Sequence, residues 1–211
     1  MSSAWATGRG GSGGPARPSP PARAPSSARQ RILETAYDLF SRNGFRAVGV
    51  DRIIDESGVA RKTFYRHFPS KTDLILAFLD LRGQRWTHEW LEAEIYRLGS
   101  TPRERILAVF DVLDEWFHRE DFESCALLAT VFEVRDKTDP VQQAAARQLE
   151  EVRRVLLDIA EQSKTPDPES LASHVQTLMM GAIVSATRED LDAARRAREL
   201  AVLLLDRRRL R

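Results

Sequence analysis

Apolar residues recur at helical spacing along almost the whole chain after position 26, and this pattern constrains the fold most strongly. Residues 27–211 contain only 6 Gly and 5 Pro, and most of these lie between the helical stretches. No stretch shows the alternation of apolar and polar residues that is typical of a half-buried β-strand. The sequence therefore predicts an all-α fold.

Nine helices are expected, separated by breaks of Gly, Pro and polar residues. Asn43-Gly44 is a strong signal for the end of the first helix. Ser70 and Asp73 have the spacing of a capping box that opens the fourth helix, which can continue to Leu98. The segment 124–134 is apolar on most sides, so we expect it to be buried. The expected ranges are 27–43, 50–57, 59–67, 70–98, 101–117, 124–134, 140–162, 171–186 and 189–205.

The composition excludes several classes of protein. With 32 Lys+Arg, 31 Asp+Glu and 42% hydrophobic residues, the 211 residues can form one large or two small soluble domains. No window approaches the roughly 18 consecutive apolar residues of a membrane helix, and the N-terminus lacks the apolar region of a secretory signal. The single cysteine, Cys125, excludes an intrachain disulfide and favours a reducing compartment, so we expect a cytoplasmic protein without membrane contact.

Residues 1–26 differ from the rest, since they hold 5 Gly, 5 Pro and three arginines but no acidic residue. This segment lacks the apolar surface that offsets the entropy of ordering, so we expect it to be disordered. It is either a solvated tail or a basic arm that helps to hold a polyanion.

Three short helical stretches, with Gly58 in the turn between the second and the third, predict a helix-turn-helix unit. The apolar residues expected to pack this unit are Ile53, Val59, Phe64 and Phe68. The other side chains of the third stretch are cations, hydroxyls and an imidazole, with no acidic residue before Lys71: Arg61, Lys62, Thr63, Tyr65, Arg66 and His67. Such groups donate to phosphate oxygens and base edges, and the major groove admits a helix, so we expect them to bind DNA.

The run from Ile53 to Leu74, IIDESGVARKTFYRHFPSKTDL, resembles the signature of the TetR family of bacterial transcriptional regulators. The preceding Leu39-Phe40 and Asn43-Gly44-Phe45 also match the family's pattern. The resemblance implies a nine-helix TetR-like fold. It implies a helix-turn-helix DNA-binding domain over residues 27–72 and a ligand-binding and dimerisation domain over 73–211.

The resemblance also implies roles for single residues. It makes Arg61, Lys62 and Thr63 groove-facing or base-reading residues, and Tyr65 and His67 phosphate contacts. Lys71 matches a lysine at the start of the fourth helix, where the helix dipole also favours an anion. Three positions depart from the family pattern, because Ile54 replaces a small residue at a helix crossing and Gly49 and Ala60 replace hydroxyl caps.

The second half carries large apolar side chains that either pack the core or surround a pocket. The pocket hypothesis implies a small, mostly apolar or aromatic effector held by one or two polar groups, such as His88, His118, Cys125 or Glu133. The candidate ligand-binding residues are Trp86, Trp90, Phe110, Leu113, Trp116, Phe117, Cys125, Phe132 and Met179.

The apolar faces of the last two expected helices, 171–186 and 189–205, are the candidate dimer interface. Their small residues let helices approach closely in a four-helix bundle. A two-fold dimer would present two recognition helices to half-sites about 34 Å apart on a palindromic operator. The candidate dimerisation residues are Leu171, Val175, Leu178, Ala182, Ala186, Ala194, Ala197, Ala201 and Leu205.

We therefore expect a ligand-responsive repressor that binds double-stranded DNA as a homodimer and needs no cofactor or metal. An enzyme has little support, because His88 with Glu92 and His118 with Asp121 are pairs that lack a third ligand or a nucleophile. A nonspecific, nucleoid-type binder is the other alternative. It would use the N-terminal arginines and the C-terminal cluster Arg207, Arg208, Arg209 and Arg211.

Overall fold

The computed structural model describes residues 27–120, 122 and 125–207. Its elements are α1 (Ala28–Asn43), α2 (Val50–Ser57), α3 (Arg61–His67), α4 (Lys71–Gly83), the π-helical η1 (Gln84–Glu92), α5 (Ala93–Leu98), α6 (Pro102–Phe117), α7 (Ala126–Glu133), α8 (Pro140–Gln162), α9 (Pro168–Ala186) and α10 (Ala193–Arg207). Because α4, η1 and α5 follow one another without a break, the described residues form nine continuous helices and no strand. The all-α, nine-helix expectation is confirmed. The N-terminal tail and the arginines after Arg207 lie outside the described residues.

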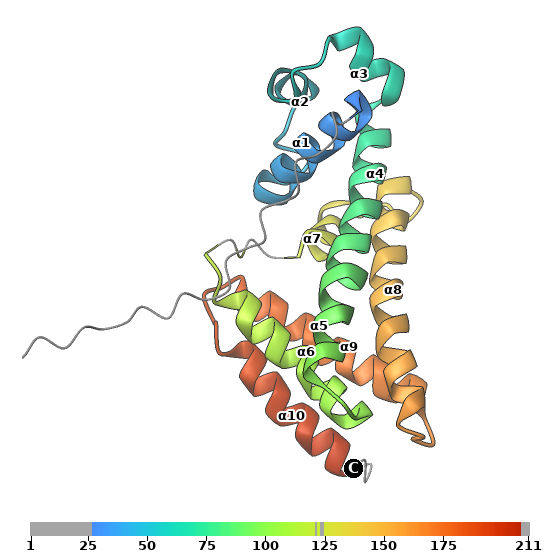
Figure 1. Cartoon of the computed structure of the whole chain (residues 1–211), viewed down its shortest axis with the longest axis vertical. Helices are drawn as coiled ribbons and strands as arrows, with labels where there is room; N and C mark the ends of the chain where they lie inside the picture. The colour runs from blue at the N-terminus through green and yellow to red at the C-terminus, as the bar shows by residue number, and fades with distance from the viewer. Residues whose placement is uncertain (1–26, 121, 123–124, 208–211) are drawn as a thin grey trace, which may run out of the picture.

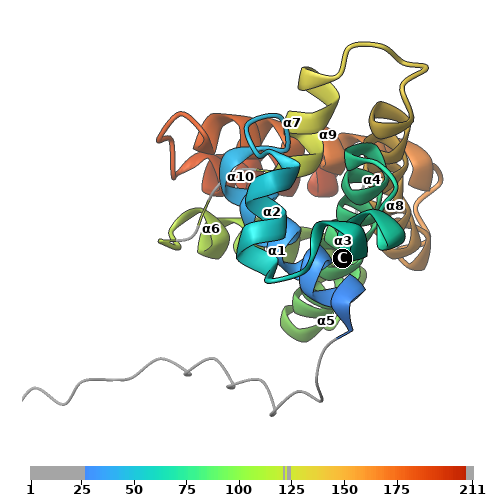
Figure 2. The ribbon, with the colours of Figure 1, turned by 90° about the horizontal axis from the view of Figure 1, so that it is seen from above.

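The helices gather at two ends of the long helix α4–η1–α5 (Figure 1). At one end α1 packs against α2, α3 and the beginning of α4. The rest of the long helix runs beside α8, and α6, α9 and α10 pack together at the other end. The helix-turn-helix unit is therefore attached to a larger helical body through α4, and seen from above α2 and α3 lie over it (Figure 2).

Several helices begin at the caps that the sequence supplies. The Ser70 hydroxyl accepts from the Asp73 amide at 3.1 Å, and the Asp73 carboxylate accepts from the Ser70 amide at 2.9 Å, which confirms the expected capping box. Thr101 and Glu104 form a second capping box at the start of α6. Asp139 caps α8 ahead of a proline at the first helical position.

One local expectation is wrong. The last helix begins at Ala193 rather than at 189, because Glu189 adopts a left-handed φ of 67° and leaves the preceding turn non-helical. The short helix α7 is buried through Leu127, Leu128 and Thr130, as expected, although Phe132 is 68% exposed. The π-helical turns of η1 carry no signal in the sequence.

The buried apolar side chains form one continuous core through the helix-turn-helix unit and the body. Leu74, Phe78 and Leu79 of α4 belong to it and link the two parts. Within the described ranges, no helix combines the length and the apolar character that crossing a membrane requires.

Candidate nucleic-acid interface

Gly58 forms the turn between α2 and α3. Its φ of 65° and ψ of 31° place it in the left-handed region, and its amide donates to the Asp55 carbonyl at 3.3 Å. A residue with a Cβ in this conformation costs roughly 1–2 kcal/mol. The glycine therefore lets the chain reverse within three residues, so that α3 begins at Arg61.

The apolar residues expected in the unit lie in its core. Ile53 and Phe64 are 0% exposed, and Val59 and Phe68 are also buried. Ile54 is buried in this core as well, so α1 and α2 pack around the larger side chain. The guanidinium carbon of Arg29, near the start of α1, lies 5.1 Å from the centroid of the Phe68 ring, and this cation–π contact fixes α1 beside the end of α3.

The outward face of α3 carries the polar side chains that the sequence singled out. Lys62 and Arg66 are exposed, and Tyr65 is 43% exposed. Thr63 and His67 are half-buried at the edges of this face. We call the exposed and half-buried polar residues of α3, together with Lys71, the α3 surface. It is cationic, and a duplex would meet hydrogen-bond donors there.

Arg61 is held by an acidic residue from the preceding helix. Its Nη2 donates to Asp51 Oδ1 at 2.6 Å, although the two side chains are 61% and 73% exposed. This pair was not predicted from the sequence. The only available signal was an acidic residue in the first turn of α2, which by itself indicates a favourable contact with the helix dipole.

The starts of α2 and α3 lack side-chain caps. Gly49 and Ala60 occupy the N-cap positions, and neither makes a side-chain hydrogen bond to its helix. Both helices therefore begin without the capping hydrogen bond that a serine or threonine would make. Such a bond contributes about 1 kcal/mol relative to alanine.

Lys71 is the first residue of α4 and is half-buried. Burial lowers the pKa of its ammonium group, and the charge of Glu133 on α7 partly opposes this effect. The capping box uses the amides of Ser70 and Asp73, which leaves the Lys71 and Thr72 amides as the first-turn donors outside the box. Lys71 thus brings a cation and a helix N-terminus to the edge of the α3 surface.

The aromatic residues singled out in the body pack against one another. The Trp86 ring centroid lies 5.7 Å from that of Trp90 and 5.5 Å from that of Trp116, and Trp90 and Trp116 are 5.8 Å apart. Phe122, which the sequence analysis missed, lies 5.0 Å from Trp116 and 5.2 Å from Phe117. We call these five rings the aromatic cluster. Phe110, Leu113, Cys125 and Met179 are also buried, whereas the exposed Phe132 is not part of the cluster.

Two buried polar atoms beside this cluster have no hydrogen-bond partner among the described residues: Trp86 Nε1 and Thr87 Oγ1. Thr87 is 0% exposed, and both residues belong to the π-helical η1. Buried donors without partners are costly, and π-helical turns are frequent at functional sites. Burial raises the pKa of the Cys125 thiol, which keeps it protonated.

The other polar candidates lie elsewhere. His88 is exposed, and its Nδ1 is 2.9 Å from Glu92 Oε2. His118 is also exposed, and its Nδ1 is 2.8 Å from the carbonyl oxygen of Asp114. Glu133 faces the α1–α2 loop, where Arg46 Nη2 donates to its carbonyl at 2.9 Å. Across the part of the chain that the structure describes, no three His, Cys, Asp or Glu side chains are grouped to hold a metal ion.

The candidate dimerisation residues lie mostly inside the protomer, so these side chains do not form an exposed surface, whereas dimerisation through α9 and α10 stays a prediction. Eight of them are at most 6% exposed and Leu178 is half-buried: Leu171, Val175, Ala182, Ala186, Ala194, Ala197, Ala201 and Leu205. The physical reason is that α9 and α10 pack against each other and against α6. The strongest apolar periodicity therefore marks the chain's own core.

The outward faces of α9 and α10 carry other apolar residues. Val184 is 43% exposed, Leu200 is 53% exposed and Leu203 is 65% exposed. Gly181 is exposed three positions before Val184, and Leu200 and Leu203 have the same spacing, so each pair lies on one side of its helix. We call these four residues the α9–α10 outer face.

Two family models match the chain. One, described as bacterial regulatory proteins of the tetR family, matches residues 32–78. The other, described as the C-terminal domain of tetracyclin repressor-like proteins, matches residues 102–201. The first covers the helix-turn-helix unit with most of α4, and the second covers most of the body.

Curated relatives match the chain over short stretches. The transcriptional regulator QacR of Staphylococcus aureus is 30% identical over 67 residues, which are 32% of this chain and 36% of QacR. The transcriptional activator FasR of Mycolicibacterium smegmatis is 41% identical over 51 residues, which are 24% of this chain and 23% of FasR. The match thus spans well under half of each relative.

Solved structures match over most of the chain. SCO4454, a TetR-family transcriptional regulator from Streptomyces coelicolor, has a TM-score of 0.76 and 28% identity, covering 88% of this chain and 91% of that one. The sav143 regulator from Streptomyces avermitilis has a TM-score of 0.72 and 27% identity, covering 88% and 100%. The arrangement of the helix-turn-helix unit and the body is therefore shared with known regulators.

Proposed function

This chain belongs to the TetR family of bacterial regulatory proteins, and we propose that it is a ligand-responsive transcriptional repressor. In this proposal a dimer binds a palindromic operator and a small, mostly apolar effector releases it. Both halves match models of regulatory proteins, so the enzyme alternative is discarded.

The α3 surface is the observation that carries DNA binding. It combines exposed Lys62 and Arg66 with the hydroxyls of Thr63 and Tyr65, on a helix that contains no acidic residue. We assign Lys62 and Thr63 to base edges, because they lie in the first turn, where recognition helices commonly contact bases. Tyr65, His67 and Lys71 are assigned to phosphates.

We propose that dimerisation uses the α9–α10 outer face in place of the buried stripes. Its exposed valine and leucines are the kind of surface that a second copy covers. An isologous contact of two helices from each chain would form a four-helix bundle and would orient two α3 surfaces by two-fold symmetry. The half-sites would then be about 34 Å apart or a near multiple of that distance.

The effector site that we propose lies at the aromatic cluster. A ligand that separated these rings could use the unpaired Trp86 Nε1 and Thr87 Oγ1 as hydrogen-bond partners. These two residues lie on the same continuous helix as Lys71, so a change in η1 would alter the placement of the helix-turn-helix unit. To shift the DNA-competent state from 99% to 1%, a ligand needs about 5.5 kcal/mol of preference for the other state.

Activation is the second candidate. FasR, to which this chain is 41% identical over 51 residues, is named a transcriptional activator. Transcription of an operator-linked reporter, with and without this protein, distinguishes the two: a repressor lowers expression and an activator raises it.

Selection of random duplexes on the purified protein tests the proposal. A palindromic site bound by the dimer is the expected result, with log affinity falling against log salt by about 0.9 per phosphate neutralised. A nucleoid-type binder would enrich no site, and that outcome would overturn the proposal.

A further inference from the structure

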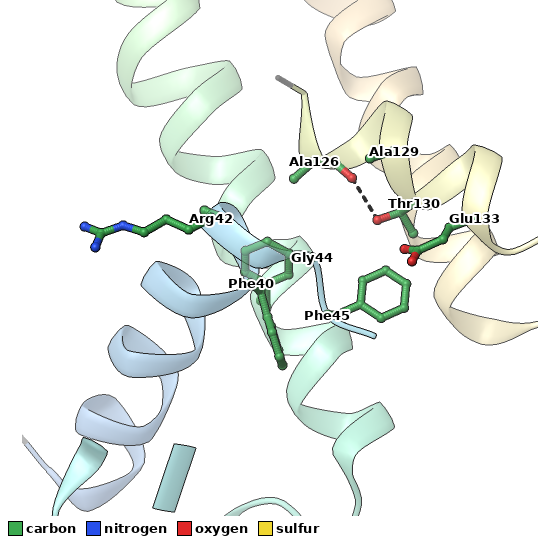
Figure 3. Close-up of a pocket in the computed structure, with 10 residues that line it drawn as sticks. Phe40, Arg42, Gly44, Phe45, Ala126, Ala129, Thr130 and Glu133 are labelled. Atoms are coloured by element: carbon green, nitrogen blue, oxygen red, sulfur yellow. Dashed lines mark hydrogen bonds between the residues drawn. The ribbon is translucent and has the colours of Figure 1, made fainter. Parts of the chain in front are cut away.

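A cavity lies where the helix-turn-helix unit meets the body. It has a volume of about 140 Å³. Phe40 and Phe45, from the end of α1 and the following loop, line one side, and α7 lines the other (Figure 3). We call it the junction cavity. It is separate from the aromatic cluster, since none of the five rings of that cluster lines it.

The walls of the junction cavity are aromatic and rigid. The rings of Phe40 and Phe78 meet edge to face with centroids 5.4 Å apart, and both side chains are at most 2% exposed. Phe45 is 8% exposed and completes this side. A preformed apolar cavity of about 150 Å³ is known to accept one benzene ring, so this volume suits a single-ring molecule.

Three of the lining residues, Ser41, Thr130 and Glu133, carry hydroxyl or carboxylate oxygens. Ser41 Oγ is buried and has no hydrogen-bond partner among the described residues. Thr130 Oγ1 donates to the Ala126 carbonyl at 2.8 Å, so its lone pairs remain available as acceptors. The Glu133 carboxylate is the third group. The guanidinium of Arg42, another lining residue, points away from the cavity (Figure 3).

We propose that the junction cavity binds a single-ring aromatic molecule that carries a hydrogen-bond donor, such as a phenol or an arylamine. The ring fills the space between the phenylalanines and α7. The donor group pairs with the Ser41 hydroxyl, which is buried without a partner in the structure and reaches the ligand after rotation about χ1. A carboxylate on the ligand is disfavoured, because it would share the cavity with the carboxylate of Glu133.

Occupancy of this cavity would hold the end of α1 against α7. Arg46 already connects the same two regions, since its Nε is 3.6 Å from Glu133 Oε1. The ligand would add contacts across this junction between the DNA-binding part and the body. Binding at the junction is independent of the proposed operator binding and of the proposed effector site.

Titration of the full chain with phenol, toluene and benzoate tests the proposal. These probes share one ring and differ only in the attached group. Protein-detected NMR follows the amides of residues 40–45 and 126–133, which flank the cavity. We expect phenol to bind at these amides with an affinity about tenfold above that of benzoate, as one well-placed polar contact allows.

Variants localise the binding. Ser41→Ala should weaken phenol about three- to tenfold and leave toluene unchanged, since a neutral hydrogen bond contributes this much. Ala126→Leu should abolish binding of both rings by filling the cavity. The control Ser173→Ala changes an exposed serine whose hydroxyl donates to the Glu169 carbonyl at 2.8 Å, and it should change neither affinity.

Three results overturn the inference: no shift with any ring, equal binding of benzoate and phenol, or phenol binding that Ser41→Ala leaves unchanged. The last comparison remains decisive even if Ala126→Leu fails to fold. Operator binding without phenol binding would reject the junction site and leave the proposed function intact.

Discussion

Arg61 and Asp51 form an ion pair across the Gly58 turn, with Nη2 and Oδ1 2.6 Å apart. The carboxylate fixes the direction of the guanidinium and adds a negative charge beside the α3 surface. Because both groups are exposed, the pair contributes at most about 1 kcal/mol to stability. We therefore expect its main effect to be on DNA binding.

Asp51→Asn should therefore increase binding to random DNA and reduce the preference for the operator. The released guanidinium is free to contact one more phosphate, which steepens the salt dependence by about 0.9. Fluorescence anisotropy at several salt concentrations measures both quantities. Asp55→Asn is the control, with the same charge change on the same exposed helix. Equal effects of the two variants would indicate a general charge effect and refute a specific role for the pair.

Lys62→Ala should reduce the preference for the operator, whereas Lys71→Ala should reduce the affinity for all DNA. Loss of Lys62 or of the Thr63 hydroxyl should cost about 1–3 kcal/mol on the operator and little on random DNA, because each is assigned to bases. Loss of Lys71 should weaken all sequences alike and flatten the salt slope by about one unit. Parallel titrations with operator and scrambled duplexes separate these outcomes. Uniform losses in every variant would contradict the assignment.

Leu200→Glu should convert the protein to a monomer, because the dimer would bury a carboxylate without a partner. The dimer dissociation constant is expected to rise about 100-fold or more, measured by analytical ultracentrifugation. Phe132→Glu is the matched control, since Phe132 is also exposed at 68% but lies on α7. A monomeric Phe132→Glu variant with a dimeric Leu200→Glu variant would place the interface elsewhere.

Glu104 gives the stability of α6 a dependence on pH. Hydrogen bonds from the amides of Thr101 and Ser100 hold the pKa of its carboxyl below the ordinary value of 4.5. The carboxylate therefore stabilises the fold above pH 4.5, and this contribution is lost as the pH falls through the lowered pKa. Urea unfolding should show Glu104→Gln less stable than wild type at pH 7, with the difference shrinking in acid. Glu115→Gln, an exposed change on the same helix, is the control for loss of a carboxylate outside the capping box.

The order of the helices could be predicted from the sequence because their ends are marked by local chemistry. Gly58, the Ser70–Asp73 capping box and the proline that begins α8 act through their own backbone or near neighbours. The residues of the α3 surface were predictable for the same reason. Once α3 is packed through Phe64, its remaining side chains must face outward.

Features that depend on distant contacts were not predictable. Ala194 and Ala201 have the small size and spacing of a helix–helix interface, but sequence alone does not say whether the neighbouring helix belongs to the same chain. In the structure α6 and α9 of the same chain cover them. The Arg61–Asp51 pair likewise depends on how α2 and α3 meet, and nothing in the sequence marks the π-helical turns of η1.

The uninterrupted helix α4–η1–α5 has a mechanical consequence. In an α-helix each residue adds about 1.5 Å of rise and about 100° of rotation. Exchange of a π-helical turn for an α-helical turn in η1 would therefore move α4 along its axis and rotate it about that axis. A shift of one residue in the helix register near Trp86 would therefore translate and rotate the helix-turn-helix unit at the other end of this helix. In the proposed mechanism, substitutions in the middle of this helix would therefore change the response to an effector without changing the residues assigned to DNA.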